Sequence, residues 1–109
     1  MEMIDTTKLT QVLRDAVAQA RIAVADMDEH GTCNLDSPVL YVTHPSHGIE
    51  VALDRAGCTY WYSRSSWHRG YVLGIGIGGQ GNTRTTAAEV VSKALEEHGF
   101  DSGVWYQMD

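Results

Sequence analysis

Residues 71–91 read YVLGIGIGGQGNTRTTAAEVV, in which an apolar run leads through a cluster of glycines into a helical pattern. Large apolar side chains alternate with smaller ones over 71–77, which is the period of a β-strand. Beyond the glycines, Thr86 and Glu89 have the spacing of a capping box, and the apolar residues that follow predict a helix over 86–98. This stretch therefore predicts a strand, a glycine-rich turn and a helix in succession.

The rest of the chain supplies one long helix and more short strands. Apolar residues recur at three- and four-residue spacings over 6–27, which predicts an amphipathic helix. Runs rich in β-branched and aromatic residues, separated by short turns, predict strands over 39–43, 49–54, 58–63 and 103–108. The expected order is α-β-β-β-β-α-β, with antiparallel neighbours arranged as a meander because the turns are short.

These elements predict a single α+β domain over residues 1–109. We expect a two-layer sandwich in which two helices cover an antiparallel sheet of four to five strands. The chain has 109 residues, of which 43% are hydrophobic, and this composition is typical of a globular domain.

Composition also limits the location and the partners of the protein. No apolar stretch is long enough to span a membrane, and the first residues lack the pattern of a secretory signal, so we expect a cytoplasmic protein. Cys33 and Cys58 are then expected to stay reduced. A net charge of −6 argues against direct contact with nucleic acid. It favours another protein, with a basic surface, as the partner.

The glycine cluster is a candidate site for a small anionic ligand. Its glycines satisfy the G-x-G-x-x-G spacing after a strand and before a helix, where backbone N–H groups would bind a phosphate. The chain has too little parallel sheet for a full dinucleotide-binding domain. The alternative is that Gly74 or Gly76 only allows a helix or a large ring to pack closely. The candidate ligand residues are Gly78, Gly79, Gly81, Asn82, Thr83 and Arg84.

Two groups of residues carry weak metal signals. Asp26, Asp28, His30 and Gly31 match the start of a calcium loop, but Ser37 stands where a bidentate glutamate is needed. A second group, which would suit zinc, consists of His44, His47, His68 and Asp54. We expect neither group to bind a metal and expect no cofactor.

The richest candidate for a binding surface is YWYSRSSWHRGY, residues 60–71. Tryptophan, tyrosine and arginine are the residues that most often contribute binding energy at protein interfaces. Strand alternation places Tyr60 and Tyr62 on one face and Trp61 on the other. The alternative is an aromatic core with a polar hairpin tip. The candidate partner-binding residues are Arg64, Trp67, His68 and Arg69.

The sequence offers no recognisable catalytic set, so we expect a non-enzymatic protein-binding module. In size and charge the chain resembles inhibitors of nucleic-acid-handling complexes, of the anti-CRISPR type, that phages and mobile elements encode. The first alternative is a protein that binds a nucleotide or another phosphate ligand at the glycine loop. The second alternative is a metal-dependent hydrolase.

Overall fold

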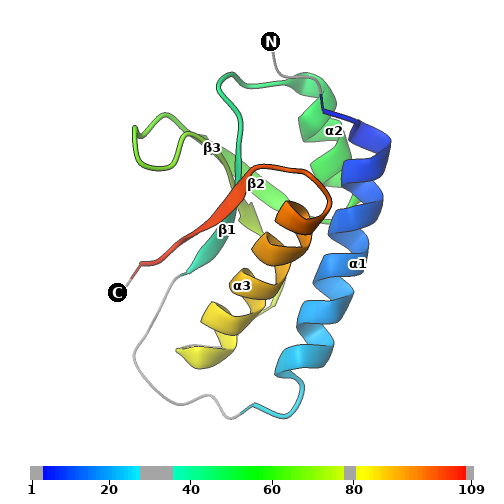
Figure 1. Ribbon diagram of the computed structural model, residues 1–109, viewed down its shortest axis with the longest axis vertical. Coiled ribbons are helices and arrows are strands. Elements are labelled where there is room, and N and C mark those ends of the chain that lie inside the picture. Colours follow the sequence, from blue (N-terminus) through cyan, green and yellow to red (C-terminus); the bar gives the residue numbers. More distant parts are fainter. Residues whose placement is uncertain (1–3, 28–35, 78–80, 108–109) are drawn as a thin grey trace.

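The computed structural model describes residues 4–27, 36–77 and 81–107 (Figure 1). In chain order its elements are α1 (Thr6–Val24), β1 (Ser37–Tyr41), α2 (His47–Arg55), β2 (Thr59–Ser63), β3 (Gly70–Gly74), α3 (Asn82–Glu97) and β4 (Ser102–Trp105). The α+β class and the antiparallel sheet are confirmed, with four strands in the sheet. The element order is α-β-α-β-β-α-β, so the structure contains one helix more than the sequence predicted.

The additional helix is α2, and the predicted strand over 49–54 is wrong. Ser46 caps this helix, since its side-chain oxygen accepts a hydrogen bond from the Ile49 N–H at 3.3 Å. Gly57 follows the last turn with a φ of 79°, a left-handed conformation that ends helices. Ile49 and Leu53 alternate as in a strand, but together with the buried Ala52 they also form one face of a helix. The capping residues Ser46 and Gly57 therefore decide in favour of a helix over a strand.

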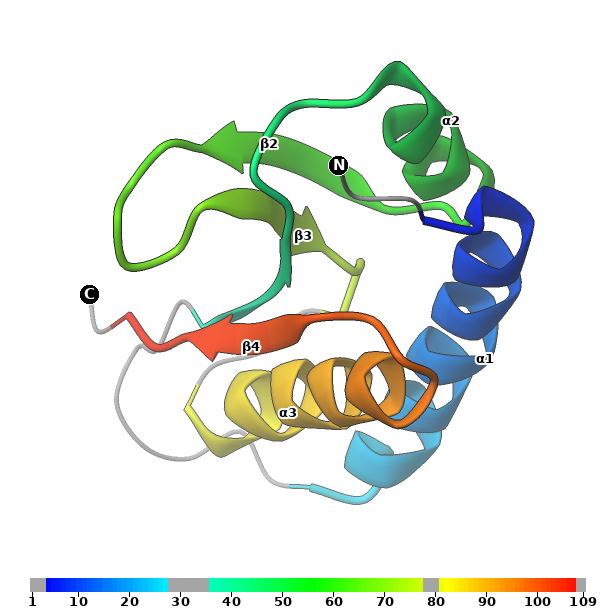
Figure 2. The same ribbon diagram turned by 45° about the horizontal axis from the view of Figure 1, so that its top comes forward.

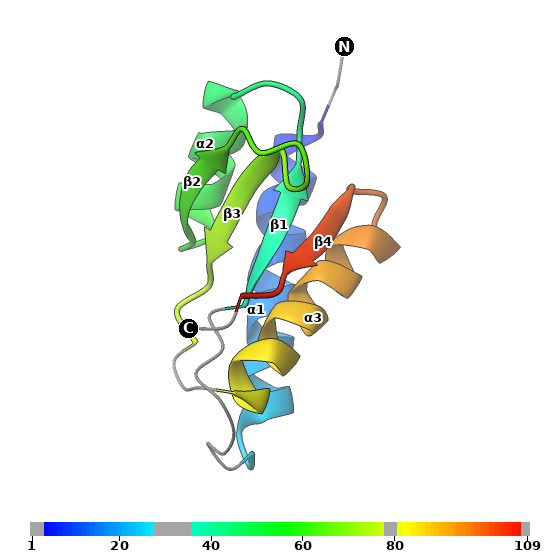
Figure 3. The same cartoon turned by 90° about the vertical axis from the view of Figure 1, so that its left-hand side faces the viewer.

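The strands do not follow one another across the sheet as a meander. Their spatial order is β2-β3-β1-β4, and all neighbouring pairs are antiparallel (Figure 3). Of these pairs, β2 and β3 alone follow each other directly in the chain. Because α2 occupies the connection between β1 and β2, β1 is free to lie between β3 and β4.

The glycine cluster also differs from its predicted geometry. The predicted strand over 71–77 stops at Gly74, because Gly76 has a φ of 72° and leaves the extended conformation. Helix α3 begins at Asn82, earlier than predicted, and its N-cap is Gly81 rather than Thr86.

All three helices contribute to one core on a single side of the sheet, which we call the helix side. Helix α1 runs beside α3, and its N-terminal end lies against α2 (Figures 1 and 2). Leu40, Tyr71 and Leu73 point from the sheet into this core, and each is almost completely buried. Burying apolar side chains of this size supplies most of the stabilisation of a small domain.

Candidate functional site

The opposite face of the sheet, which we call the open face, has no described helix against it (Figure 3). Strand alternation and the observed register place Trp61, Val72 and Val39 side by side on this face. Val39 is 0% exposed and Val72 is 6% exposed, although neither belongs to the helix-side core. Other side chains must therefore cover them.

That cover is a group of four rings, the aromatic cluster, formed by Tyr41, Trp61, His68 and Trp105. The Trp61 and Trp105 rings have centroids 5.5 Å apart and are tilted by 50°. The His68 ring is stacked on Trp105 at 5.0 Å and on Tyr41 at 6.1 Å. These distances lie within the range of favourable aromatic pairs. The cluster joins three strands to the loop that precedes β3.

One end of the aromatic cluster depends on a glycine. A Cβ atom at Gly103 would lie 2.5 Å from the Tyr41 hydroxyl oxygen and 2.9 Å from a ring carbon. The Tyr41 side chain can therefore lie across β4 because Gly103 has no side chain. The Tyr41 hydroxyl shares a hydrogen bond of 3.1 Å with His68 Nδ1.

Carboxylates stand near this end of the cluster. Burial, followed by the negative charges of Asp101 and Glu96, raises the pKa of Tyr41 above its ordinary value. The Tyr41 hydroxyl therefore stays protonated at neutral pH and keeps its hydrogen bond to His68. The two carboxylates give this end of the cluster a negative surface.

The tip loop, residues 64–69, extends from this same end of the sheet, where Tyr41 pairs with Gly70 and Gly70 pairs with Ser63. Trp67 stands on this loop with 85% of its surface exposed. The loop backbone is held by serine side chains, since the Ser65 N–H donates to Ser63 Oγ and the Trp67 N–H donates to Ser65 Oγ, each at 3.2 Å. The exposed Trp67 therefore belongs to a loop whose backbone is hydrogen-bonded. The next residue, His68, packs in the aromatic cluster.

The structure brings together the four candidate partner-binding residues, but in different roles. Arg64 lies over the Tyr62 ring at 5.3 Å from its centroid, and Arg69 donates to the Arg64 carbonyl oxygen at 3.5 Å. Both arginines are exposed and flank Trp67 along the tip loop. His68, in contrast, is half-buried between two rings.

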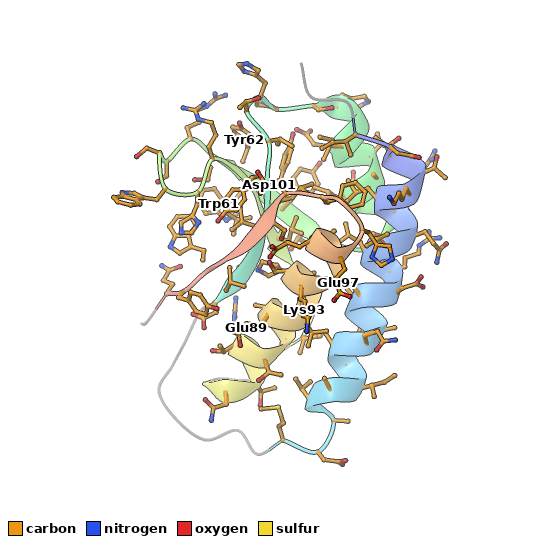
Figure 4. The ribbon with its side chains drawn as sticks, in the orientation of Figure 1. Trp61, Tyr62, Glu89, Lys93, Glu97 and Asp101 are labelled. Carbon is orange, nitrogen blue, oxygen red and sulfur yellow. The ribbon has the colours of Figure 1, made fainter. Side chains whose placement is uncertain are left out.

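The aromatic strand has the predicted facing. Tyr60 and Tyr62 pack against the helix-side core, while Trp61 lies on the open face and is 53% exposed (Figure 4). Within the segment 60–71 the tyrosines therefore belong to the core side and the tryptophans lie at the surface, where a role in binding stays a prediction.

The candidate anion site is only partly described. Gly78 and Gly79 lie outside the described residues. Gly81 is the N-cap of α3 and has no side chain to offer to the first turn, which begins at Asn82. The Thr83 hydroxyl is buried and has no hydrogen-bond partner among the residues that the structure describes.

Arg84 is engaged within the protein, because its Nε donates to the Asp36 carbonyl oxygen at 3.1 Å. The Asp36 carboxylate accepts hydrogen bonds from the Thr85 hydroxyl at 2.6 Å and from the Gln107 N–H at 2.7 Å. A cavity of about 340 Å³ opens beside these groups, between β1, β3 and the start of α3. Arg84 and the 4% exposed Asp36 both line it, so a guanidinium and a carboxylate share its wall.

The glycine strand is closely packed at Gly74, but the neighbouring group differs from the helix or large ring that the sequence predicted. A Cβ at Gly74 would collide with the Thr59 hydroxyl on the neighbouring strand, so the group that fills this space is neither a helix nor a large ring. A Cβ at Gly76 would lie 3.5 Å from the Arg21 guanidinium of α1.

The metal candidates do not assemble within the part of the chain that the structure describes. No group of three or more His, Cys, Asp or Glu side chains there could hold a metal ion. His44 and His47 are exposed around the start of α2, whereas His68 is held in the aromatic cluster. The calcium-loop candidate falls mostly on residues 28–35, which lie outside the described residues.

Several residues that shape the two sites were not identified from the sequence. Tyr41 and Trp105 belong to the aromatic cluster, and their alternation with core residues was the available signal. Asp36 lies one residue before the position where the calcium loop would need a glutamate, and it bonds instead to Thr85 and to Gln107. Nothing in the sequence marks those long-range hydrogen bonds.

No family model, curated protein or solved structure matches the chain. Within the described residues, no helix is both long enough and apolar enough to cross a membrane.

Proposed function

We propose that this protein is a non-enzymatic binding module that contacts another protein through the tip loop and the aromatic cluster. The observation that carries the proposal is that Trp67 is exposed although its loop is held in place. Its side chain is 85% exposed, yet the loop backbone is hydrogen-bonded and the adjacent His68 ring is stacked between Tyr41 and Trp105. Because hydrogen bonds already hold the backbone of the tip loop, less conformational freedom is lost when a partner covers Trp67 than on a free loop, which favours binding.

The charges around the surface indicate what a partner would present. Arg64 and Arg69 flank Trp67, and they suit carboxylates or aromatic rings at the centre of the contact. Asp101 and Glu96 lie near the Tyr41 end of the cluster and suit basic groups at the rim. Together with a net charge of −6, these carboxylates support a partner whose surface is largely basic.

An inhibitor of a nucleic-acid-handling complex is the specific form of this proposal. What supports it is the small size and the acidic charge of the chain, since a protein of this kind would occupy a basic surface that otherwise holds nucleic acid. We propose that it acts in the cytoplasm.

The experiment that tests the proposal compares Trp67→Ala with Tyr106→Ala. Tyr106 is also exposed, at 59%, but lies beyond β4 and bonds to Glu89 of α3. A partner recovered with the wild-type protein would be titrated against each purified variant by calorimetry. We expect Trp67→Ala to weaken binding by at least about 2 kcal/mol and Tyr106→Ala to have a much smaller effect. Equal binding by the wild type and Trp67→Ala would reject the tip loop as the contact.

A second candidate function is the binding of a small anion in the cavity beside Arg84. The cavity of about 340 Å³ and the α3 N-terminus, which has no side-chain cap, favour it. The nearby Asp36 carboxylate and the internal hydrogen bond of Arg84 make this cavity less suited to an anion than to a neutral polar group. Calorimetry with inorganic phosphate and with a nucleoside triphosphate would test it, with Arg84→Ala expected to abolish any binding.

A further inference from the structure

The outer edge of β2 is the feature that the proposed function leaves unexplained. β2 is the first strand in the sheet order, so no described strand pairs with its outer side (Figure 3). Backbone N–H and C=O groups of a strand point alternately to its two sides, so about half of those in β2 point away from β3. Proteins usually protect such an edge with lysine, proline or a bulge. β2 reads TYWYS over five residues and contains none of these residues.

The sequence of this edge is nearly symmetric about Trp61. In an antiparallel pair of two copies with Trp61 opposite Trp61, Tyr60 lies opposite Tyr62 and Thr59 lies opposite Ser63. This register places no like charges opposite each other in β2, and Thr–Ser pairs are favourable across antiparallel strands. We propose that β2 pairs with β2 of a second copy of this chain and so forms a symmetric homodimer with a continuous eight-stranded sheet.

The charges at the two ends of β2 suit the same arrangement. Asp54, at the end of α2, lies close enough to Tyr60 to raise the pKa of its hydroxyl, although burial contributes more. Arg64 lies over the Tyr62 ring at the opposite end. Because Tyr60 of one copy faces Tyr62 of the other, each Asp54 carboxylate approaches the Arg64 guanidinium of the second copy. Antiparallel pairing therefore places opposite charges together at both ends.

Two of the large side chains of β2 turn away from its outer edge. The Trp61 ring leans inward across the open face to Trp105, with 5.5 Å between the ring centroids. The Tyr62 hydroxyl donates to the Val42 carbonyl oxygen at 2.7 Å, so this side chain also turns under the sheet. The contact is isologous, with the same patch on both copies, and it closes at two subunits.

Sedimentation equilibrium over a micromolar-to-millimolar series tests the proposal on the full chain. Trp61→Lys would place two lysines across the symmetry axis, and we expect it to raise the dimer dissociation constant by at least about tenfold. Trp105→Lys is the matched control, because it removes the other ring of the same pair and adds the same charge away from β2. We expect Trp105→Lys to dimerise as the wild type does.

A charge exchange supplies a second, independent measurement. Asp54→Arg and Arg64→Asp should each weaken the dimer, and the double variant should restore it, because only the double variant has opposite charges together again. Hydrogen exchange of the β2 amides should slow as protein concentration rises, while that of the β4 amides should not change. Thermal melts would show that each variant is folded before its association is measured.

Three results would overturn the proposal: a wild-type monomer at every concentration, a dimer that Trp61→Lys leaves intact, or a dimer that Trp105→Lys weakens as much as Trp61→Lys does. The last result would assign the contact to the open face instead. Trp67→Ala separates this inference from the proposed function, since it should reduce partner binding and leave the dimer unchanged.

Discussion

On the helix side of the sheet, Leu40 and Leu73 lie beneath three helices, whereas on the open face Val39 and Val72 lie beneath four aromatic rings. Both pairs of residues are buried. On the helix side the cover consists of many side chains from three helices. On the open face it consists of a few aromatic rings whose outer surface remains exposed to water. The comparison shows how this small domain keeps aromatic groups at its surface and still buries its valines.

The helix side should be the more sensitive of the two faces. Leu40 is 0% exposed on the central strand, so Leu40→Ala would leave a cavity that three helices cannot fill. We expect a loss of about 2–5 kcal/mol in the free energy of unfolding, measured by urea denaturation. A loss below about 1 kcal/mol would mean that the helix-side core repacks freely, and the contrast between the faces would disappear.

Tyr71 provides a pH-dependent test of the same side. Burial, reinforced by the 2.6 Å hydrogen bond to Glu50, raises the pKa of Tyr71 to about 12, against an ordinary value of 10.0. A raised pKa in the folded state means that the stabilisation is complete below pH 10.0 and is lost as the pH rises towards 12. We therefore expect the urea midpoint of the wild type to fall over this window.

Tyr71→Phe is the matched variant for that measurement. At neutral pH it should cost about 1–3 kcal/mol, because the Glu50 carboxylate and the Ser46 N–H lose their partner. Its midpoint should then fall less steeply than that of the wild type on the alkaline side. Parallel curves for the two proteins would show that Tyr71 keeps its ordinary pKa in the fold.

His68 tests how the open face is held together. His68→Ala removes two stacked contacts, with Tyr41 and with Trp105, and we expect a loss of about 1–2 kcal/mol in the free energy of unfolding. Exposure of Trp105 should also shift the tryptophan fluorescence to longer wavelength. Unchanged stability and fluorescence would mean that the rings lie beside His68 without stabilising the sheet.

Trp67 should have the smallest effect on stability. Its ring is 85% exposed, so we expect Trp67→Ala to change the free energy of unfolding by no more than about 0.5 kcal/mol. The same urea assay applies. A loss comparable to that of His68→Ala would place Trp67 among the stabilising rings and would weaken the case for a binding surface on the tip loop.

The sequence was informative where a pattern is local. The facing of Tyr60, Trp61 and Tyr62 follows from the two-residue period of a strand, and the structure has that facing. Helix α2 was missed because Ile49 and Leu53 fit both periods, so the alternation could not decide between strand and helix. Its cap residues were the better signal.

The aromatic cluster could not be predicted because its members come from distant parts of the chain. Trp105 reaches His68 because β4 pairs with β1, with Ser37 opposite Trp105, and nothing local in the sequence specifies that register. The same holds for Asp36, whose carboxylate bonds to Thr85 and to Gln107. Contacts of this kind depend on the order of strands in space, which composition and spacing do not fix.

The central position of β1 determines when the sheet can be completed as the chain is synthesised. β1 is the first strand to leave the ribosome, yet both of its neighbours, β3 and β4, are made later. Until Ser102–Trp105 emerges, one edge of β1 stays unpaired and the aromatic cluster lacks Trp105, the ring that contacts both Trp61 and His68. A nascent chain of this protein therefore carries an apolar strand with one unpaired edge until β4 is made, and the aromatic cluster is completed only then.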